Sequence, residues 1–364
     1  MPKHANPANS ESDANFLGWQ ENDLSGGMFP LFNITVAGHP LYQSTVSEAT
    51  LRGLCLRVPR TPCPEVRPSP WRNLGVELNN PKTAREALEM AGLDYTVVMK
   101  PLALKTVLKQ GAYAMVRTDT DGALGFVKEN YEPIQNVDAF KFFDSLIAGD
   151  EARYETAGVL GNGECIWMLA KLSGCIKVHN NDIVNKYLLL TNSHDGSSQV
   201  SVKITPIRVI CNNTLTAALQ GAGEIQINHT QDAAKDLEQA VTILGLSNSL
   251  YEQLDVTFNG MASKKITEEQ LRQYVQALVP DNEETEDAVG TERVINRVLQ
   301  LHDSGRGAHL SRWTLWAAFN SVAEYTDHMM FHKESTTRLN SIWFGHGEQL
   351  KLKAFRLAEQ MMQA

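Results

Sequence analysis

The chain has 364 residues, of which 43% are hydrophobic and 21% charged, and its formal net charge is −9. This composition is typical of a folded protein and excludes a wholly disordered chain. The acidic balance disfavours broad, nonspecific binding to duplex nucleic acid, because affinity for phosphates comes from clustered Lys and Arg.

The sequence shows neither a membrane span nor a secretory leader. No apolar run approaches the roughly 18 to 20 residues needed to cross a bilayer, and the N-terminal residues lack an apolar segment behind a basic start. The five cysteines form no CxxC pair, so we expect reduced thiols. Together these features predict a cytoplasmic protein with no membrane partner.

Composition divides the chain into three zones. Residues 1–70 are rich in Pro, Ser, Asn and Gly and are predicted to be a loosely ordered N-terminal extension. Residues 71–220 are predicted to form an antiparallel, β-rich α+β core. Residues 221–364, with 20 acidic against 13 basic residues, are predicted to be a helical C-terminal region packed on that core.

The first predicted helix follows Pro81. Thr83 and Glu86 have the spacing of a capping box, and Gly92 ends the apolar pattern. A short helix over 83–92 is therefore expected.

From residue 95 to residue 210 the pattern is that of β-strands. One hairpin pairs 113–117 with 123–127 through an Asp-Gly turn, and a second pairs 156–160 with 164–172. Further strands are expected over 187–190 and 199–204, and a helix over 137–147. Because short turns link most strands, we predict an antiparallel, hairpin-rich sheet packed by helices, an α+β fold.

After residue 219 the pattern becomes helical. Helices are predicted over 232–244, 267–280, 291–302, 311–331 and 348–362. Thr267 and Gln270 have the spacing of a capping box at the start of the second of these. Trp316 and Phe319 have the spacing of core residues. Glu324 and His328 lie four residues apart, which favours an ordinary surface pair over a metal site.

The stretch 187–219 holds polar residues at the ends of apolar strands. A strand that runs into a helix presents free backbone N–H groups, and an Arg nearby adds a bidentate donor, so this junction is predicted to bind an anion. The candidate nucleic-acid- or anion-binding residues are Lys203, Thr205, Arg208, Asn212, Asn213, Thr214, His194 and Asp195. No catalytic residue, metal ligand or cofactor is assigned.

Each of these residues also has a structural explanation. Asn212 or Asn213 would only cap the helix, and Arg208 would pair with a carboxylate such as Glu164. His194 and Asp195 would only form a β-turn. The adjacent His and Asp also suggest a metal-dependent phosphohydrolase, although that class carries the pair on a helix rather than in a turn.

Several motifs occur in the order found in one known family. They are YEPIQN (131–136), ETAGVLGNGECIWMLAKL (155–172), TNSHDGSSQVSVKITPIRVICNNTL (191–215), His229-Thr230 and WTLWAAFNSVAEYTDH (313–328). Over about residues 71–357 the chain resembles the phage/plasmid-like family of uncharacterised proteins called domain of unknown function nine hundred thirty-two. It departs from that family at 71–75, where WRNLG replaces a Trp-His-Gly-Leu-Gly-like opening. The resemblance implies a protein of a mobile genetic element and transfers no activity.

Three functions are compatible with these features. The favoured one is a non-enzymatic module that binds single-stranded DNA, for annealing or protection, and forms a homo-oligomer. By fold-level analogy alone it resembles the annealing proteins of phage recombination. The second is an interaction protein that blocks or recruits a host factor through its acidic helical half. The third is the metal-dependent phosphohydrolase.

Overall fold

The structure is a computed structural model that describes residues 75–104, 107–179, 181–196, 200–215, 224–226, 233–279, 288–330 and 335–364. The predicted extension at 1–70 lies outside these residues. The strands are β1 (Val76–Glu77), β2 (Val97–Leu104), β3 (Val107–Arg117), β4 (Ala123–Lys128), β5 (Ala152–Leu160), β6 (Cys165–Val178), β7 (Asp182–Ser193), β8 (Ser201–Ile204), β9 (Ile207–Arg208), β10 (Asn213–Thr214) and β11 (Glu224–Gln226). The helices are α2 (Ala84–Ala91), α3 (Asn136–Lys141), α4 (Asp144–Ala148), α5 (Ala233–Ser263), α6 (Glu268–Leu278), α7 (Ala288–Ser304), η1 (Ala308–Leu310), α8 (Leu315–Glu324), η2 (Tyr325–Met329), α9 (Ser335–Trp343) and α10 (His346–Gln363).

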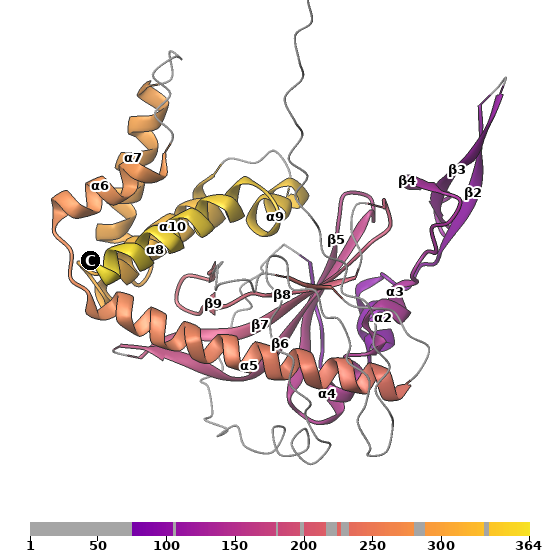
Figure 1. The fold of residues 1–364 in the computed structure, drawn as a ribbon, viewed down its shortest axis with the longest axis horizontal. Coiled ribbons are helices and arrows are strands. Elements are labelled where there is room, and N and C mark those ends of the chain that lie inside the picture. The colour runs from indigo at the N-terminus through magenta and orange to yellow at the C-terminus, as the bar shows by residue number, and fades with distance from the viewer. Residues whose placement is uncertain are drawn as a thin grey trace, which may run out of the picture.

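The large sheet is antiparallel throughout. Its strand order is β1-β5-β6-β7-β8-β11, with β9 paired to β7 and β10 paired to β9. Both predicted hairpins form, as β3–β4 and β5–β6, with strands longer than the sequence pattern indicated. In Figure 1 the C-terminal helices lie on the opposite side of the molecule from the small sheet β2–β3–β4. The predicted α+β class is confirmed.

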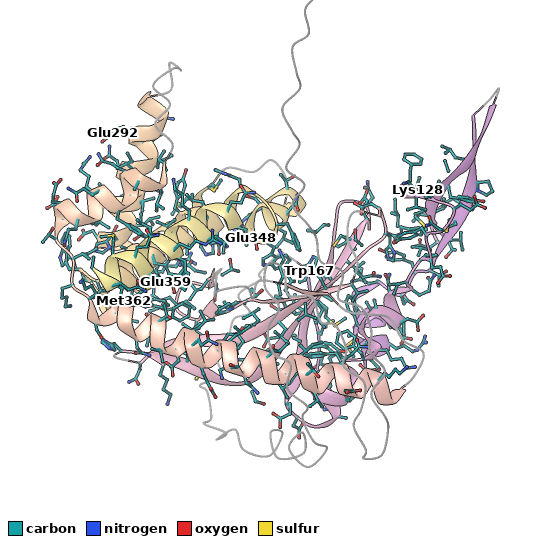
Figure 2. All side chains as sticks on the ribbon, viewed as in Figure 1. Lys128, Trp167, Glu292, Glu348, Glu359 and Met362 are labelled. Carbon is teal, nitrogen blue, oxygen red and sulfur yellow. The ribbon has the colours of Figure 1, made fainter. Side chains whose placement is uncertain are left out.

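The central strands are apolar on both faces because helices cover both sides of the sheet. Ile166 and Met168 of β6 join a large core that includes residues of α5, α8 and α10. Trp167 and Leu169, which alternate with them, join a second core with α9. There the ring of Trp167, which Figure 2 labels, meets that of Trp343 edge-on, with the ring centroids 4.8 Å apart.

The small sheet has the order β2-β3-β4 and packs one face against the body through Val97, Met115 and Val127. The side-chain amide of Gln135 closes the edge of β2, because it donates to the carbonyl of Val97 and accepts from its N–H, both at 3.0 Å. Pro101 lies on the same strand edge and has no N–H to offer, which limits the addition of another strand there.

The predicted helix caps are largely correct. Thr83 accepts from the N–H of Glu86 at the start of α2, and Gly92 ends that helix with a φ of 67°. The capping box of Thr267 and Gln270 at α6 is complete. These short-range signals are reliable because both partners lie within one helical turn.

Helix extents are less well predicted. The helix expected over 137–147 is two helices, α3 and α4, and the break lets the consecutive rings of Phe142 and Phe143 both enter the core. α5 extends to Ser263, well past the predicted end at 244, and α9 was not predicted. The helix expected over 311–331 begins at Leu315, and its last turn widens into the π-helix η2.

Two global expectations concern the membrane and the cysteines. Among the described helices, none is long and apolar enough to span a bilayer. Cys211 is a free thiol, but Cys175 is disulfide-bonded, so the expectation of reduced thiols throughout is wrong at that position.

Candidate functional site

The predicted anion site is closed. Arg208 on β9 is only 2% exposed, and its guanidinium pairs with the equally buried Asp182, with the terminal nitrogen 2.6 Å from a carboxylate oxygen. The Nε atom donates to both oxygens of Asp182, and another nitrogen donates to the carbonyl of Gly307 at 3.0 Å. The expectation of an accessible Arg208 is therefore wrong, and its partner is Asp182 rather than Glu164.

Asn212, Asn213 and Thr214 do not begin a helix. Asn213 and Thr214 form β10, paired with β9, and Asn212 adopts a φ of 58° in the turn between the two strands. The side chain of Asn213 donates to the carbonyl of Asn320 in α8 at 3.2 Å. The sequence correctly indicated polar residues with a special role, but their partners are other parts of the same chain.

Thr214 contributes to a second buried ion pair. Its N–H and its hydroxyl both donate to one oxygen of Asp327, at 2.6 and 2.7 Å. Lys351 of α10 donates to the other oxygen of Asp327 at 2.8 Å and also to the Thr214 hydroxyl. The side chains of Lys351 and Asp327 are 0% and 3% exposed.

We refer to Asp182, Arg208, Thr214, Asp327 and Lys351 as the polar junction. It connects the sheet to α8, η2 and α10, since Trp316 of α8 donates to Asp182 of the first pair and Thr214 of β10 donates to Asp327 of the second. Removing one member of a buried pair leaves an uncompensated charge in the interior, which is strongly destabilising. The polar junction therefore stabilises the packing of the sheet against the helices. An external ligand would have to displace Asp182 to reach Arg208.

The remaining residues of the predicted groove are also engaged internally. Lys203 forms an ion pair with Glu348 at 3.3 Å, donates to the carbonyl of Trp343 and lies over the ring of Phe344. Thr205 is buried, and its N–H donates to the carbonyl of Tyr187 at 2.9 Å. Neither residue lines an open groove.

His194 and Asp195 do lie in a turn, as the structural explanation held. His194 is fully buried, and burial lowers its pKa to about 4. Its Nε2 lies 2.6 Å from the side-chain oxygen of Asn136, whose own amide nitrogen donates to the carbonyl of Leu93. Nε2 must therefore carry the proton, and Nδ1 is a buried acceptor without a donor.

This turn supports the small sheet. A Cβ built on Gly125 of β4 would lie 2.5 Å from the Cα of Asp195, so the two backbones touch and only glycine fits. Arg117 at the end of β3 lies 3.7 Å from the ring of Tyr95, whose hydroxyl donates to the carbonyl of Gly163. The turn with His194 and Asp195 thus packs against the small sheet and supports it, rather than forming a ligand site.

The expected surface pair on the late helix is wrong. Glu324 is 6% exposed and accepts from the backbone N–H of Arg306, and burial raises its pKa. His328 is half-buried with a pKa lowered by burial, and its Nδ1 lies 3.3 Å from Arg338. In the described parts of the chain, no three His, Cys, Asp or Glu side chains are grouped to hold a metal ion.

The surface that the sequence reading missed is the solvent-facing side of β2–β3–β4, which we call the open face. It carries Phe126, which is 68% exposed, and Val98, which is 38% exposed. The strand register aligns Lys100, Ala114 and Phe126 in one row across the sheet. Lys128 follows on the same side of β4, and Figure 2 shows it on this projecting sheet.

A β-bulge determines which side chains of β4 reach the open face. Strict alternation would place Leu124, Phe126 and Lys128 together on one side of the strand. The β3–β4 register shifts between Met115 and Val116, so Leu124 is buried while Phe126 and Lys128 face solvent. Alternation alone therefore assigns Phe126 to the same side as the core residue Leu124, and no local signal in the sequence marks the shift.

The segment that contains the open face has a basic composition. Residues 97–128 include five Lys or Arg and two Asp, a formal charge of +3 in a chain whose total is −9. Among its described side chains, Lys100 and Lys128 lie on the open face, whereas Arg117 lies on the other side of the sheet against Tyr95. Lys100 is paired with Asp121 at 2.8 Å, but both side chains are largely exposed. Such pairs contribute little and exchange readily, so a phosphate can replace Asp121.

The fold and these surfaces define an α+β protein with a closed polar junction and one exposed, basic and aromatic sheet face. A family model described as a domain of unknown function (DUF932) matches residues 123–343, more than half of the chain, and the protein belongs to that family. The match is shorter than the span of 71–357 inferred from the motifs. No curated protein and no solved structure matches the chain.

Proposed function

We propose that this protein binds single-stranded DNA without catalysing a reaction, and that the strand lies on the open face of β2–β3–β4. The observation that carries the proposal is Phe126, a large aromatic ring that is 68% exposed beside Lys100 and Lys128. Exposed aromatic rings on a basic sheet are the usual means of binding unpaired bases, because every base has a π-face to stack on the ring.

The neighbours of Phe126 suit this role. Ala114 is directly opposite it on β3 and Ala112 is opposite Lys128, so small side chains flank the ring and leave room for a base. The buried face of the sheet is anchored by Val97, Met115 and Val127, which keeps the platform in place. A base that stacks on Phe126 must be unpaired, so single strands are favoured over duplexes.

The charge distribution also supports binding at this face. Lys100 and Lys128 lie on the open face, within a segment (97–128) whose formal charge is +3, whereas the whole chain has −9. The acidic remainder of the chain repels a polyanion, so this contrast favours the small sheet as the place where a strand binds. Affinity should fall steeply with salt, since counterions are released when Lys100 and Lys128 contact phosphates.

The test is fluorescence anisotropy of a labelled single-stranded oligonucleotide with the full chain. Phe126→Ala should weaken binding by about tenfold or more, since stacking of one base on an aromatic side chain is worth about 1–3 kcal/mol. Lys100→Ala and Lys128→Ala should each reduce the slope of log affinity against log salt by about one.

Met90→Ala is the matched control, because Met90 is an exposed hydrophobic residue, 47% accessible, on α2 and outside the small sheet. It should bind like the wild type. Equal affinity of Phe126→Ala and wild type, or equal affinity of the wild type for duplex and single strand, would overturn the proposal. In that case the interaction-protein alternative would be the next to test.

Annealing or protection of strands belongs to the same proposal and rests on fold-level analogy with annealing proteins, whereas the link to a mobile genetic element rests on the family resemblance. A cytoplasmic location is also part of the proposal. The free thiol of Cys211 supports that location, whereas the disulfide at Cys175 argues against it. Alkylation of thiols at the moment of cell lysis tests this point, because Cys175 escapes alkylation if the disulfide forms in the cell and is alkylated if Cys175 is reduced there.

A further inference from the structure

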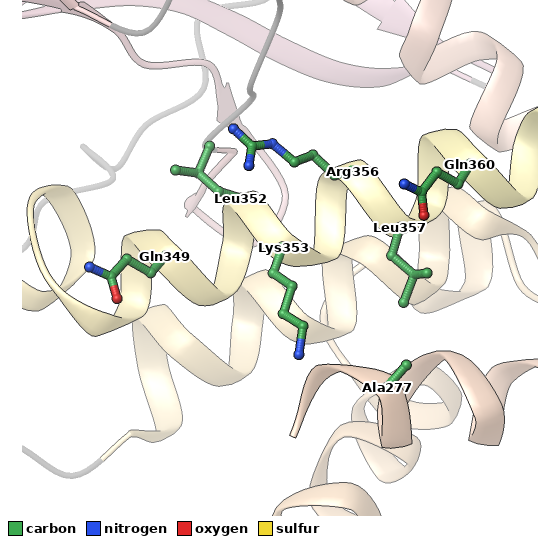
Figure 3. Close-up of a pocket in the computed structure, with 7 residues that line it drawn as sticks. All are labelled: Ala277, Gln349, Leu352, Lys353, Arg356, Leu357 and Gln360. Atoms are coloured by element: carbon green, nitrogen blue, oxygen red, sulfur yellow. The ribbon is translucent and has the colours of Figure 1, made fainter. Parts of the chain in front are cut away.

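The helix α10 has an apolar groove beside α6 that no described part of the chain fills. The groove has a volume of about 370 Å³, and its apolar lining is Leu352, Leu357 and Ala277. Figure 3 shows Lys353 and Leu357 directed toward the part of α6 that carries Ala277, with Arg356 on the other flank of α10. Lys353 and Arg356 are exposed, and no acidic side chain lines the groove.

A complementary surface occurs on α5. Val256 is 77% exposed, more than any other large hydrophobic side chain in the described residues. Glu252, one helical turn before Val256, is exposed as well, and so is Asp255. The opposite side of α5 is buried through residues such as Phe258, so Val256 and its acidic neighbours face away from the core.

We propose that the groove on α10 binds the Val256 surface of α5 from a second copy of this chain. Val256 would enter the groove against Leu357 and Ala277, which removes apolar area from water on both sides. Glu252 of the second copy would face Lys353 or Arg356, and such opposite charges fix register and suppress wrong partners.

The contact joins two different surfaces, so it is head-to-tail. Each copy that uses its groove still has a free Val256 surface, and the assembly continues into a ring or a filament. This contact is independent of nucleic-acid binding, because none of its residues lies in β2–β3–β4.

Sedimentation velocity over a range of protein concentrations tests the proposal. The wild type should form species larger than a monomer as its concentration rises. Val256→Asp and Arg356→Glu should each weaken self-association by at least about tenfold, since each places a charge against an apolar or like-charged surface.

A mixture of the two variants gives the decisive result. The Arg356→Glu copy keeps an intact Val256 surface and the Val256→Asp copy keeps an intact groove, so together they should form a dimer that grows no further. Met90→Asp and Arg85→Glu, which alter exposed residues of α2, are the controls and should assemble like the wild type. The proposal would be overturned if the wild type stayed monomeric, or if Arg356→Glu or Val256→Asp assembled as strongly as the wild type. It would also be overturned if the mixture of these two variants failed to dimerise.

Discussion

The polar junction and the open face use the same kinds of side chain in opposite ways. At the junction, Arg208 and Lys351 are buried and each is neutralised by an internal aspartate. On the open face, Lys100 and Phe126 are exposed, and the one acid near Lys100 is a solvated surface partner. A charged residue in an apolar strand therefore indicates a special environment, but only its burial and its partner decide whether it serves stability or binding.

The largest expected effect is at the junction. Asp327→Ala should lower the free energy of unfolding by about 3–5 kcal/mol, because Lys351 is then left buried without its counter-charge. The matched control is Glu292→Ala, which removes the acid of an exposed pair with Arg272 and should cost less than about 1 kcal/mol. Urea denaturation measures both.

The same variants separate the two regions. Asp327→Ala, studied at a temperature where it remains folded, should keep wild-type affinity for the oligonucleotide, whereas Phe126→Ala should lose affinity and keep wild-type stability. The reverse result, with Asp327→Ala folded but unable to bind and Phe126→Ala unaffected, would invert the assignment of the two regions.

The next largest effect depends on pH. Burial lowers the pKa of His194 to about 4 from an ordinary value of 6.5, so between these values the unfolded chain binds a proton that the folded chain does not. Stability should therefore fall as the pH drops from about 6.5 to about 4, by up to about 3 kcal/mol for this residue, and show no dependence on it above pH 6.5.

His302 is buried with the same lowered pKa of about 4 and contributes in the same direction. His194→Gln should therefore remove part of the acid destabilisation and His302→Gln another part, as followed by urea denaturation at a series of pH values. An unchanged pH profile in His194→Gln would show that the imidazole of His194 has the same pKa in the folded and the unfolded chain.

The smallest effect concerns the open face alone. Asp121→Asn removes the exposed partner of Lys100 and the negative charge beside the proposed strand, so the oligonucleotide should bind about twofold to fivefold more tightly. Because the pair is exposed, the melting temperature should stay the same. Weaker binding in this variant would mean that Asp121 itself holds the strand.

Local signals in the sequence predicted much of the fold. The caps at Thr83 and Thr267, the Asp-Gly turn before β4 and the hairpin of β5 and β6 each involve residues close in the chain, and all were found in the structure. The break between α3 and α4 was not predicted, because it depends on how two phenylalanines fit a core assembled from distant segments.

The site was harder to predict, for a physical reason. The partners of Arg208 and Thr214 are Asp182 and Asp327, and Asp327 is more than a hundred residues away from Thr214 in the sequence. No local sequence pattern predicts such pairs. The sequence alone therefore does not distinguish a charged residue that pairs inside the protein from one that binds a ligand. Phe126 was overlooked for the opposite reason, since its apolar side chain resembles a core residue until the strand register is known.

The bulge in β4 has a consequence for how this protein can change. The one extra residue of the bulge determines whether the ring of Phe126 faces solvent or the interior. Deletion of one codon near Leu124 would therefore exchange the two faces of part of β4 without altering any neighbouring residue type. The platform could thus be gained or lost among related chains in one genetic step, and comparing strand lengths at this position would distinguish relatives that keep the exposed ring from those that hide it.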